Sequence, residues 1–577
     1  MSALISMFLG TDDLIKLMLF FQIISMTVLI VLHHFFKEKH EKLCMLLSAL
    51  PLLVFIVFFA FNYVKGNMFM GYQRYIGFGA AAFLIFIWGL AVYFRKTFKA
   101  YTLIACILLT MCFSETFYVI FLVNYSPYFS NFSHYGWTES FEKMVDELEE
   151  SYVLGGWKEI NFNKIRSELI PEVQKAENEN DEPGFIVALY KLRYELYDGH
   201  IWFQTNNPDA RSEAVQRLTG NDYGLSLFKD NTGNVLAVMT DESGEAYKKG
   251  IRDGTEITKW NGVPIDEAVS QVRCIDSEYV FSSIENEEIF KPAFLAGKGG
   301  NEISVSFIDE YNKEQTISIK KSGSYRSRLY SLINTLYGKN FFSNENLYSC
   351  MLNDNCGYLR VNSESFFDLG KDEIKAVLTG YYSELGEKLR ADIKLLENQG
   401  MDRMIIDLRN NKGGYDFVSQ TIASLFLDKP MMPDITNYKN GKFVQSQEAR
   451  KIGRAEWQDI PIVIIVNGET CSSGESLAYW LSRCDNAVVL GNTNTWGCAQ
   501  GTGGVSILTD DTIEVFYPVY AALTENHEPI SDPKSDRKAR IRLDYQITYD
   551  REEVIELFKN SGDDDYILNQ ALDYISK

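Results

Sequence analysis

The sequence predicts a mixed α/β protein preceded by four transmembrane helices. Four long apolar runs fill the first 124 positions, short strands and tight turns alternate between 218 and 322, and β-branched runs alternate with helical patterns from 345 onward. With 577 residues, the chain is too long for one hydrophobic core. We therefore expect a membrane segment, a helical cap, a β-rich domain and an α/β core, with these boundaries: 1–124, 125–217, 218–322 and 323–577.

The membrane prediction depends on the length of the apolar runs, which cover 17–36, 43–64, 75–94 and 101–123. Each run can cross a hydrocarbon core of about 30 Å as a helix. The first and third loops between the runs carry three basic residues each, and such loops favour the cytoplasmic side. We therefore predict an integral protein of a bacterial cell membrane, anchored in the lipid bilayer by four helices, with its larger part outside the cytoplasm.

The charge is distributed unevenly along the chain. Residues 1–124 hold nine basic and five acidic residues, which leaves 47 basic and 72 acidic residues for the rest, a net charge of −25. Phosphate binding needs a basic face, so this balance excludes nucleic acid as an expected partner.

Helical patterns between 137 and 200 end in the turn Asp198-Gly199-His200. The chain has six histidines, and three of them lie at the predicted cytoplasmic edge of the membrane: His33, His34 and His40. His134 lies in the juxtamembrane stretch. A histidine base outside the cytoplasm is therefore expected to be His200 or His527.

The β-rich region resembles a PDZ domain in its glycine spacing around Gly250, Gly254 and Gly262. The resemblance implies a module that binds an extended chain end by strand addition. Its carboxylate-binding turn would be 223–226, and the expected peptide-binding residues are Tyr223, Gly224, Leu225 and Ser226. The alternative is a small β-domain that only packs against its neighbours.

In the α/β core, strands are expected at 357–361, 404–408, 461–467 and 487–491, with a long helix near 371–398. Continuous β-branched runs between helices indicate a sheet that is covered on both faces.

Two of these strands end in motifs that could carry chemistry. Gly413-Gly414 follows the second strand, and glycines there allow backbone amides to approach a developing oxyanion. Ser472 lies at a strand-to-helix turn, where the positive helix end stabilises an alkoxide. The pair Ser472 and Glu475 also fits a capping box, which requires no catalysis.

Together these motifs resemble the tail-specific, or C-terminal processing, serine protease family over roughly residues 137–577. The shared order is the Asp-Gly-His turn, the PDZ-like region, 357–361, 407–414, 470–475, the stretch 491–497 and a terminal helix from 564. The resemblance implies a ClpP/crotonase-like core and a membrane-anchored serine endopeptidase. It would hydrolyse proteins or peptides outside the cytoplasm and recognise their C-terminal tails.

Carried over by position, Ser472 matches the family's nucleophile, and Gly413, Gly414 and Ser473 match its oxyanion hole. Cys498 stands where many members have a lysine base, so the resemblance favours the histidine-dependent, tricorn-like branch, in which His200 is the base. Lys412 replaces a usual glycine beside the oxyanion turn, and we assign it no role. Three residues are candidates for the acidic partner of the base, in decreasing order of fit: Asp536, Glu525 and Glu528.

Neither a metal nor a cofactor is expected, because the chain has no His-Glu-x-x-His sequence and no paired Cys-x-x-Cys. An oxidising exterior would permit Cys350–Cys356 or Cys484–Cys498 pairing. Two alternatives stay open. Cys471 could be the nucleophile, or the chain could be a catalytically inactive scaffold that retains the protease fold.

Overall fold

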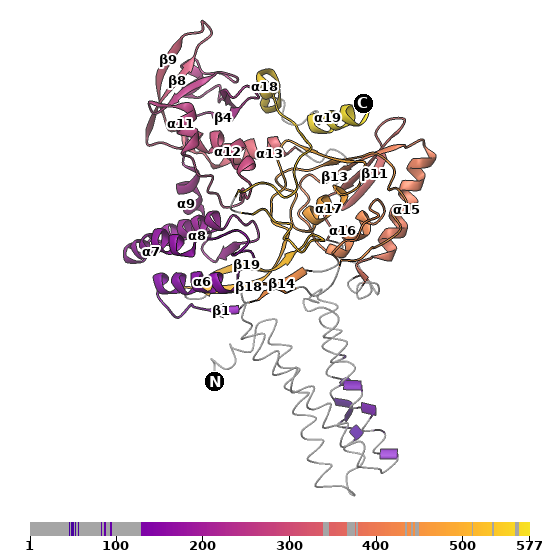
Figure 1. Cartoon of the computed structure of the whole chain (residues 1–577). Coiled ribbons are helices and arrows are strands. Elements are labelled where there is room, and N and C mark those ends of the chain that lie inside the picture. Colours follow the sequence, from indigo (N-terminus) through magenta and orange to yellow (C-terminus); the bar gives the residue numbers. More distant parts are fainter. Residues whose placement is uncertain are drawn as a thin grey trace. The chain divides into compact units, whose positions relative to one another are not determined.

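The structure is a computed structural model of the whole chain (Figure 1). It describes residues 129–577 except 339–344, 366–375, 377–378, 433–434, 440–441, 445–448, 510–511, 534–535 and 560–564, and it adds scattered positions between 45 and 94. The chain divides into two compact units, Met1–Ser130 and Asn131–Lys577. The two boundaries predicted within the second unit, after residues 217 and 322, stay predictions.

The predicted integral-membrane location is not supported and is corrected here. Among the residues that the structure describes, no helix is both long enough and apolar enough to cross a bilayer. A membrane span needs about 20 predominantly apolar residues. The longest described helix, Phe162–Glu179, has 18 residues and carries charges along its length. Apart from scattered positions, the four predicted membrane spans lie outside the described residues, and so does the predicted contact with the lipid bilayer.

Strand β1 (Phe129–Asn131) is followed by helices that pack in chain order, each against the next, and α8 packs against α9 although β2 lies between them in sequence. The helices form because apolar residues recur on one face; in the first of them Phe141, Met144, Val145 and Leu148 are buried. The elements are α6 (Trp137–Ser151), α7 (Phe162–Glu179), α8 (Glu182–Leu196), β2 (Trp202–Thr205) and α9 (Pro208–Thr219).

The region predicted to be β-rich contains a two-stranded sheet, β4-β5, and a four-stranded sheet in the order β7-β6-β8-β9. Helix α12 packs against β4. The elements are β3 (Asn221–Asp222), β4 (Ser226–Lys229), β5 (Val235–Val238), α10 (Glu245–Lys248), β6 (Ile257–Trp260), β7 (Val263–Pro264), α11 (Ile265–Ser270), α12 (Ile284–Ala296), β8 (Glu302–Ile308), β9 (Glu314–Lys320) and β10 (Gly323–Ser324).

The core sheet has the order β11-β12-β13-β16-β17-β20, and its strands from β12 onward are parallel. Both faces are covered: Met404 and Ile406 of β13 pack in one hydrophobic cluster with residues of α15–α17, whereas Ile405 packs in the other with residues of α13 and α19 (Figure 1). The elements are α13 (Arg326–Tyr337), β11 (Leu347–Met351), β12 (Cys356–Val361), α15 (Ser383–Asn398), β13 (Arg403–Asp407), α16 (Asp416–Ala423), β16 (Ile462–Ile465), α17 (Ser473–Leu481), β17 (Ala487–Gly491), β20 (Tyr545–Gln546), α18 (Arg551–Lys559) and α19 (Tyr566–Ile575).

A further sheet joins the C-terminal part of the chain to the helical region. Strand β19 pairs antiparallel with β18, with β14 and, through Phe516 and Trp202, with β2. Because β2 begins two residues after His200, this pairing brings the predicted histidine turn to the core. The strands are β14 (Ile435–Lys439), β15 (Lys442–Val444), β18 (Gln500–Leu508) and β19 (Ile513–Ala522).

Candidate active site

Three loops meet at one edge of the core sheet. They follow β13, β16 and β17, which are neighbouring parallel strands whose carboxyl ends lie together. The backbone amide of Cys471 donates to the carbonyl of Asn411 at 2.9 Å, and that of Trp496 donates to the carbonyl of Thr470 at 3.0 Å. Both predicted glycine and serine motifs therefore belong to one cluster.

Ser472 has an unusual backbone conformation at the start of α17. Its φ of 56° and ψ of −130° lie in a region that L-residues rarely adopt, and its side chain makes no capping hydrogen bond. The capping-box alternative is wrong, because the Glu475 carboxylate accepts instead from the amides of Gly497 at 2.6 Å and Cys498 at 2.5 Å. Strain of this kind at a strand-to-helix turn is typical of an exposed nucleophile.

The glycine turn packs directly against this serine. A Cβ atom placed on Gly413 would lie 2.5 Å from Ser472 Cβ and 2.9 Å from the Ser473 nitrogen. The Gly413 amide already donates to Asn411 Oδ1 at 2.8 Å. The amides of Gly414 and Ser473 have no acceptor among the residues that the structure describes. Gly413 therefore contributes space beside the serine, and the amides open to an oxyanion are those of Gly414 and Ser473.

A substitution pair tests this steric role of Gly413. Gly413→Ala is expected to lower kcat/KM at least about 10²-fold, the cost typical of a disturbed oxyanion site. Gly262→Ala is the matched control, because Gly262 has nearly the same φ (80° against 83°) but open space around its Cβ position. Comparable activity losses in both variants would show that backbone strain, not crowding at Ser472, is responsible.

A buried carboxyl group that the sequence analysis missed supports the glycine turn. Glu364 accepts a hydrogen bond from Asn411 Nδ2 at 2.8 Å, and its amide donates to the Gly413 carbonyl at 3.1 Å. Its other carboxylate oxygen has no partner among the described residues. Burial raises the pKa of Glu364 to about 7.

This shifted pKa predicts a pH-dependent stability. The pKa of Glu364 in the folded state lies above the ordinary value of 4.5. The contribution of its protonated form to the stability of the fold is therefore complete below pH 4.5 and is lost as pH rises through about 7. The loss amounts to about 3 kcal/mol in the free energy of unfolding. Urea unfolding between pH 5 and 8 should show a smaller decline for Glu364→Gln than for the unmodified chain. Glu397→Gln on the exposed face of α15 should leave the decline unchanged.

The turn that carries His200 is fixed by the carboxylate of Asp198. This buried group accepts from the His200 amide at 2.9 Å and from the Tyr152 hydroxyl at 2.6 Å, and Lys158 Nζ lies 3.5 Å away. Gly199 lies against the indole of Trp496, where a Cβ atom would come within 2.6 Å of Nε1. The histidine turn therefore contacts the loop after β17, which also contacts the serine loop.

The imidazole of His200 interacts with the thiol of Cys498, which in turn interacts with the thiol of Cys471. Burial favours the neutral ring, but the interactions with Cys498 and with the Asp198 carboxylate outweigh it and raise the pKa of His200. Burial also raises the pKa of the Cys498 thiol well above its usual value, so this thiol is protonated at neutral pH. Among the described residues, Nδ1 of His200 has no hydrogen-bond partner.

The structure does not bring Asp536 to this cluster. Its carboxylate is nearly half exposed and lies 3.6 Å from Lys538 Nζ. The two other acidic candidates also have partners elsewhere: Glu525 accepts from Tyr479 at 2.7 Å, and Glu528 pairs with Arg540.

A second buried carboxyl group beside Gly497, in addition to Glu475, is that of Asp532, which the sequence analysis missed. It accepts from Ser282 Oγ at 2.6 Å and from the Arg540 amide at 2.7 Å, and a Cβ atom on Gly497 would lie 2.3 Å from its Oδ2. Burial raises its pKa to about 6. The sequence signal that could have located it is the dipeptide Asp532-Pro533, which lies four positions before Asp536.

Lys412 lies at the mouth of the cluster. Its ammonium group pairs with Glu469 and sits 4.9 Å from the centre of the Trp496 ring, while 54% of the side chain stays exposed. Cys471, Cys484, Cys498, Cys350 and Cys356 are free thiols in the structure, so neither permitted disulfide is present. The part of the chain that is described holds no group of three His, Cys, Asp or Glu residues suited to a metal.

The four predicted peptide-binding residues are largely enclosed. The Tyr223 hydroxyl donates to the Gly300 carbonyl at 2.7 Å, the Gly224 amide donates to Asp222 Oδ1 at 2.8 Å, and Leu225 is fully buried. Ser226 is also buried and shares a short hydrogen bond with Tyr325. Carboxylate capture at this turn would first have to displace the Asp222 side chain.

Comparison with known proteins identifies related chains. Residues 355–538 match the model of Peptidase family S41. The chain is 26% identical over 308 residues to the carboxy-terminal processing protease CtpA of Bacillus subtilis, covering 52% of each chain. It is 38% identical over 96 residues to a carboxyl-terminal-processing protease of Picosynechococcus, covering 17% of this chain and 22% of that one. The chain therefore spans at most about half the length of these relatives.

Among solved structures, mature CPAF complexed with lactacystin aligns with a TM-score of 0.46 and 13% identity, covering 77% of this chain and 97% of that one. The matched family is a peptidase family, and the two curated relatives are carboxyl-terminal processing proteases.

Proposed function

We propose that this chain, whose residues 355–538 match Peptidase family S41, is a serine endopeptidase that processes proteins near their C-terminal ends. The observation that supports it best is the conformation of Ser472, a strained and uncapped serine at a helix N-terminus with a glycine turn packed against its Cβ. A serine that served only to cap α17 would bond to the first amides of that helix.

In the proposed reaction His200 takes the proton of the Ser472 hydroxyl as Oγ attacks the carbonyl carbon of a peptide bond. The amides of Gly414 and Ser473 stabilise the developing oxyanion. The carbon–nitrogen bond then breaks, and the leaving amine receives the proton from His200. A water molecule, deprotonated by the same imidazole, hydrolyses the acyl-enzyme and regenerates the serine.

Within this proposal Asp198 holds the backbone of the histidine turn, and Asp532 replaces Asp536 as the preferred acidic candidate. Asp532 is buried beside Gly497, whereas Asp536 is half exposed beside Lys538. Cys498 interacts with His200 and is next to Gly497 in sequence, so the imidazole and the Asp532 carboxylate both contact the loop between β17 and β18.

A non-catalytic scaffold is the competing function. It is separated from the enzyme by an active-site probe: a fluorophosphonate should label the full chain, and the label should be lost in Ser472→Ala but kept in Ser476→Ala. Ser476 is buried in the same helix with no hydrogen-bond partner for its hydroxyl among the described residues. Labelling that persists without Ser472 would rule out this nucleophile, and no labelling of the unmodified chain would favour the scaffold.

A further inference from the structure

A pocket of about 580 Å³ lies between the helices α8 and α9 and the β-rich region. Such a volume is typical of ligand sites, which combine an apolar floor with a few polar groups. The floor of the pocket consists of buried apolar residues from α9, from the region that runs from β6 to just past the end of α11, and from α12. They are Leu218, Trp260, Ala268, Val272 and Leu295.

The charged residues that line this pocket all have the same sign. Lys191, Arg217, Arg273 and Lys298 are part of the lining, and no aspartate or glutamate is. This is unexpected for a region of the chain with a net charge of −25. A cavity with cations only attracts an anion, and its apolar floor favours an anion that carries an apolar group.

Three of the four cations are already neutralised by carboxylates outside the lining. Lys191 pairs with Glu172 at 2.6 Å, Arg217 pairs with Asp181 at 2.6 Å, and Arg273 pairs with Glu195. Each of these cations therefore has a carboxylate that already satisfies it.

Lys298 differs from the other three. Its ammonium group donates to the carbonyl of Leu218 at 2.6 Å, and among the described residues it has no carboxylate within ion-pair distance. Burial lowers its pKa from the ordinary value. A partly buried cation without a carboxylate partner is unfavourable, and an anion bound beside it would reduce that penalty.

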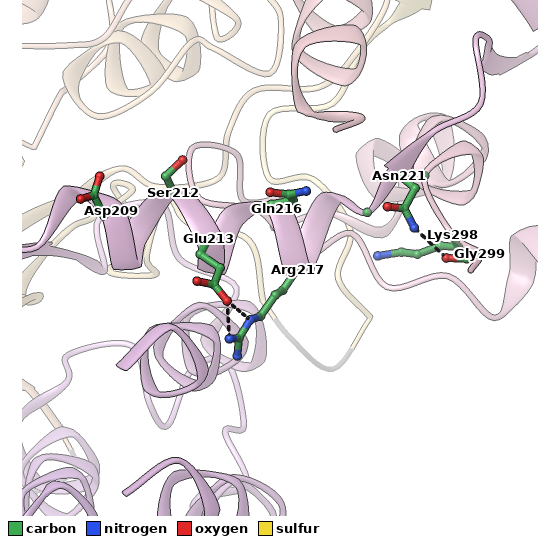
Figure 2. A pocket seen from close by; sticks show the side chains of 10 residues that line it. Asp209, Ser212, Glu213, Gln216, Arg217, Asn221, Lys298 and Gly299 are labelled. Carbon is green, nitrogen blue, oxygen red and sulfur yellow. Dashed lines mark hydrogen bonds and ion pairs between the residues drawn. The ribbon is translucent and has the colours of Figure 1, made fainter. Parts of the chain in front are cut away.

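A neighbouring pocket shares Arg217 and Lys298 but has a different character. Figure 2 shows its lining, in which Glu213 pairs with Arg217 and Asn221 donates to Gly299, while Asp209 adds a second carboxylate. Its carboxylates would repel an anion. The ligand site is therefore the pocket on the side of Trp260.

We propose that the pocket lined by Trp260 and Lys298 binds the C-terminal residue of a polypeptide substrate, with its free carboxylate on Lys298 and its apolar side chain on the floor. This rests on the proposed function, which makes an unstructured chain end the available ligand. It relocates tail recognition from the enclosed turn at Tyr223–Ser226 to a cavity that is open and cationic.

The pocket also contacts the helix that leads to the base. Val187 and Lys191 of α8 line it, and α8 ends at Leu196, just before the Asp198–His200 turn. In addition, Arg273 stacks on Tyr194 of the same helix with its guanidinium 4.5 Å from the ring centre. A bound tail would therefore rest against the element that positions His200.

The test measures binding separately from hydrolysis. Fluorescence anisotropy of a labelled peptide ending in Ala-Ala-Leu is recorded with the full-length Ser472→Ala chain, so that the peptide is not cleaved. The free acid should bind at least about 10-fold more tightly than the C-terminal amide, the range of one charge-assisted hydrogen bond. Equal affinities would overturn the proposal.

Two variants assign that preference to this pocket. Lys298→Met should abolish the difference between acid and amide, and Lys298→Arg should restore it. Gln271→Glu, at an exposed position of the lining, should weaken binding of the free-acid peptide without affecting the fold. Lys313→Met, on the turn between β8 and β9, is the control that should change nothing. A preference for the acid that survives both Lys298→Met and Gln271→Glu would place tail binding elsewhere, whereas fluorophosphonate labelling of Ser472 would still support the peptidase.

Discussion

Replacing Ser472 by alanine is expected to lower the rate of peptide hydrolysis by roughly 10⁶-fold, the loss seen when the nucleophile of a serine protease is removed. The hydroxyl has no substitute within this loop, because the neighbouring Ser473 begins α17 with its side chain buried. The measurement is kcat/KM on a quenched-fluorescence peptide, with Ser476→Ala as the control for changes in α17.

The same experiment decides the cysteine alternative. Cys471 is buried, and its amide is bonded to the Asn411 carbonyl, so its thiol is not placed where Ser472 lies. Cys471→Ala should therefore retain most activity. If hydrolysis survived in Ser472→Ala but disappeared in Cys471→Ala, the nucleophile would be the Cys471 thiol. The amides assigned to the oxyanion hole would then also have to be reassigned.

Regular structure in the core could be predicted from the sequence because continuous apolar runs determine buried strands. The strands expected at 404–408, 461–467 and 487–491 correspond to β13, β16 and β17. The helix expected near 371–398 is interrupted at Gly380, which has a φ of 68°, and α15 (Ser383–Asn398) follows the interruption. Before it, Ala376 and Thr379 are helical, and the rest of 371–378 lies outside the described residues. Apolar periodicity does not reveal such an interruption, because it arises from the left-handed conformation of a single glycine.

The turns at Gly413 and Ser472 could also be placed at one edge of the sheet, since both follow parallel strands, while their catalytic roles stay predictions. Their hydrogen bonds could not. The Gly413 amide is used by Asn411, and the Glu475 carboxylate reaches Gly497 and Cys498 rather than the amides of its own helix. These partners lie on different loops, so only the folded sheet brings them together.

Buried carboxyl groups were the least accessible to sequence reasoning. Glu364 and Asp532 stand in polar stretches that look exposed, yet both are buried among residues from other loops. The sequence spacing favours Asp536, only four positions after Asp532, but its side chain is exposed beside Lys538. A carboxylate's surroundings depend on tertiary contacts, and linear spacing does not encode them.

Replacing His200 by alanine is expected to reduce kcat/KM by about 10²–10⁴-fold, the range typical of a lost general base. Cys498→Ala should keep most activity, because the buried Cys498 thiol is protonated at neutral pH and cannot accept the serine proton. The two residues interact directly, so Cys498→Ala is also the control for disturbed packing around the imidazole.

A pH profile gives this prediction a second readout. The base must be neutral to act, and the pKa of His200 is raised above its ordinary value of 6.5. The acid limb of kcat/KM should therefore have its midpoint above pH 6.5, and activity should fall as pH drops through it. Cys498→Ala removes the hydrogen bond between the thiol and the charged ring, so the midpoint should move to lower pH while the maximal rate stays similar. An acid limb that does not move in Cys498→Ala, together with an active His200→Ala, would show that another group takes the serine proton.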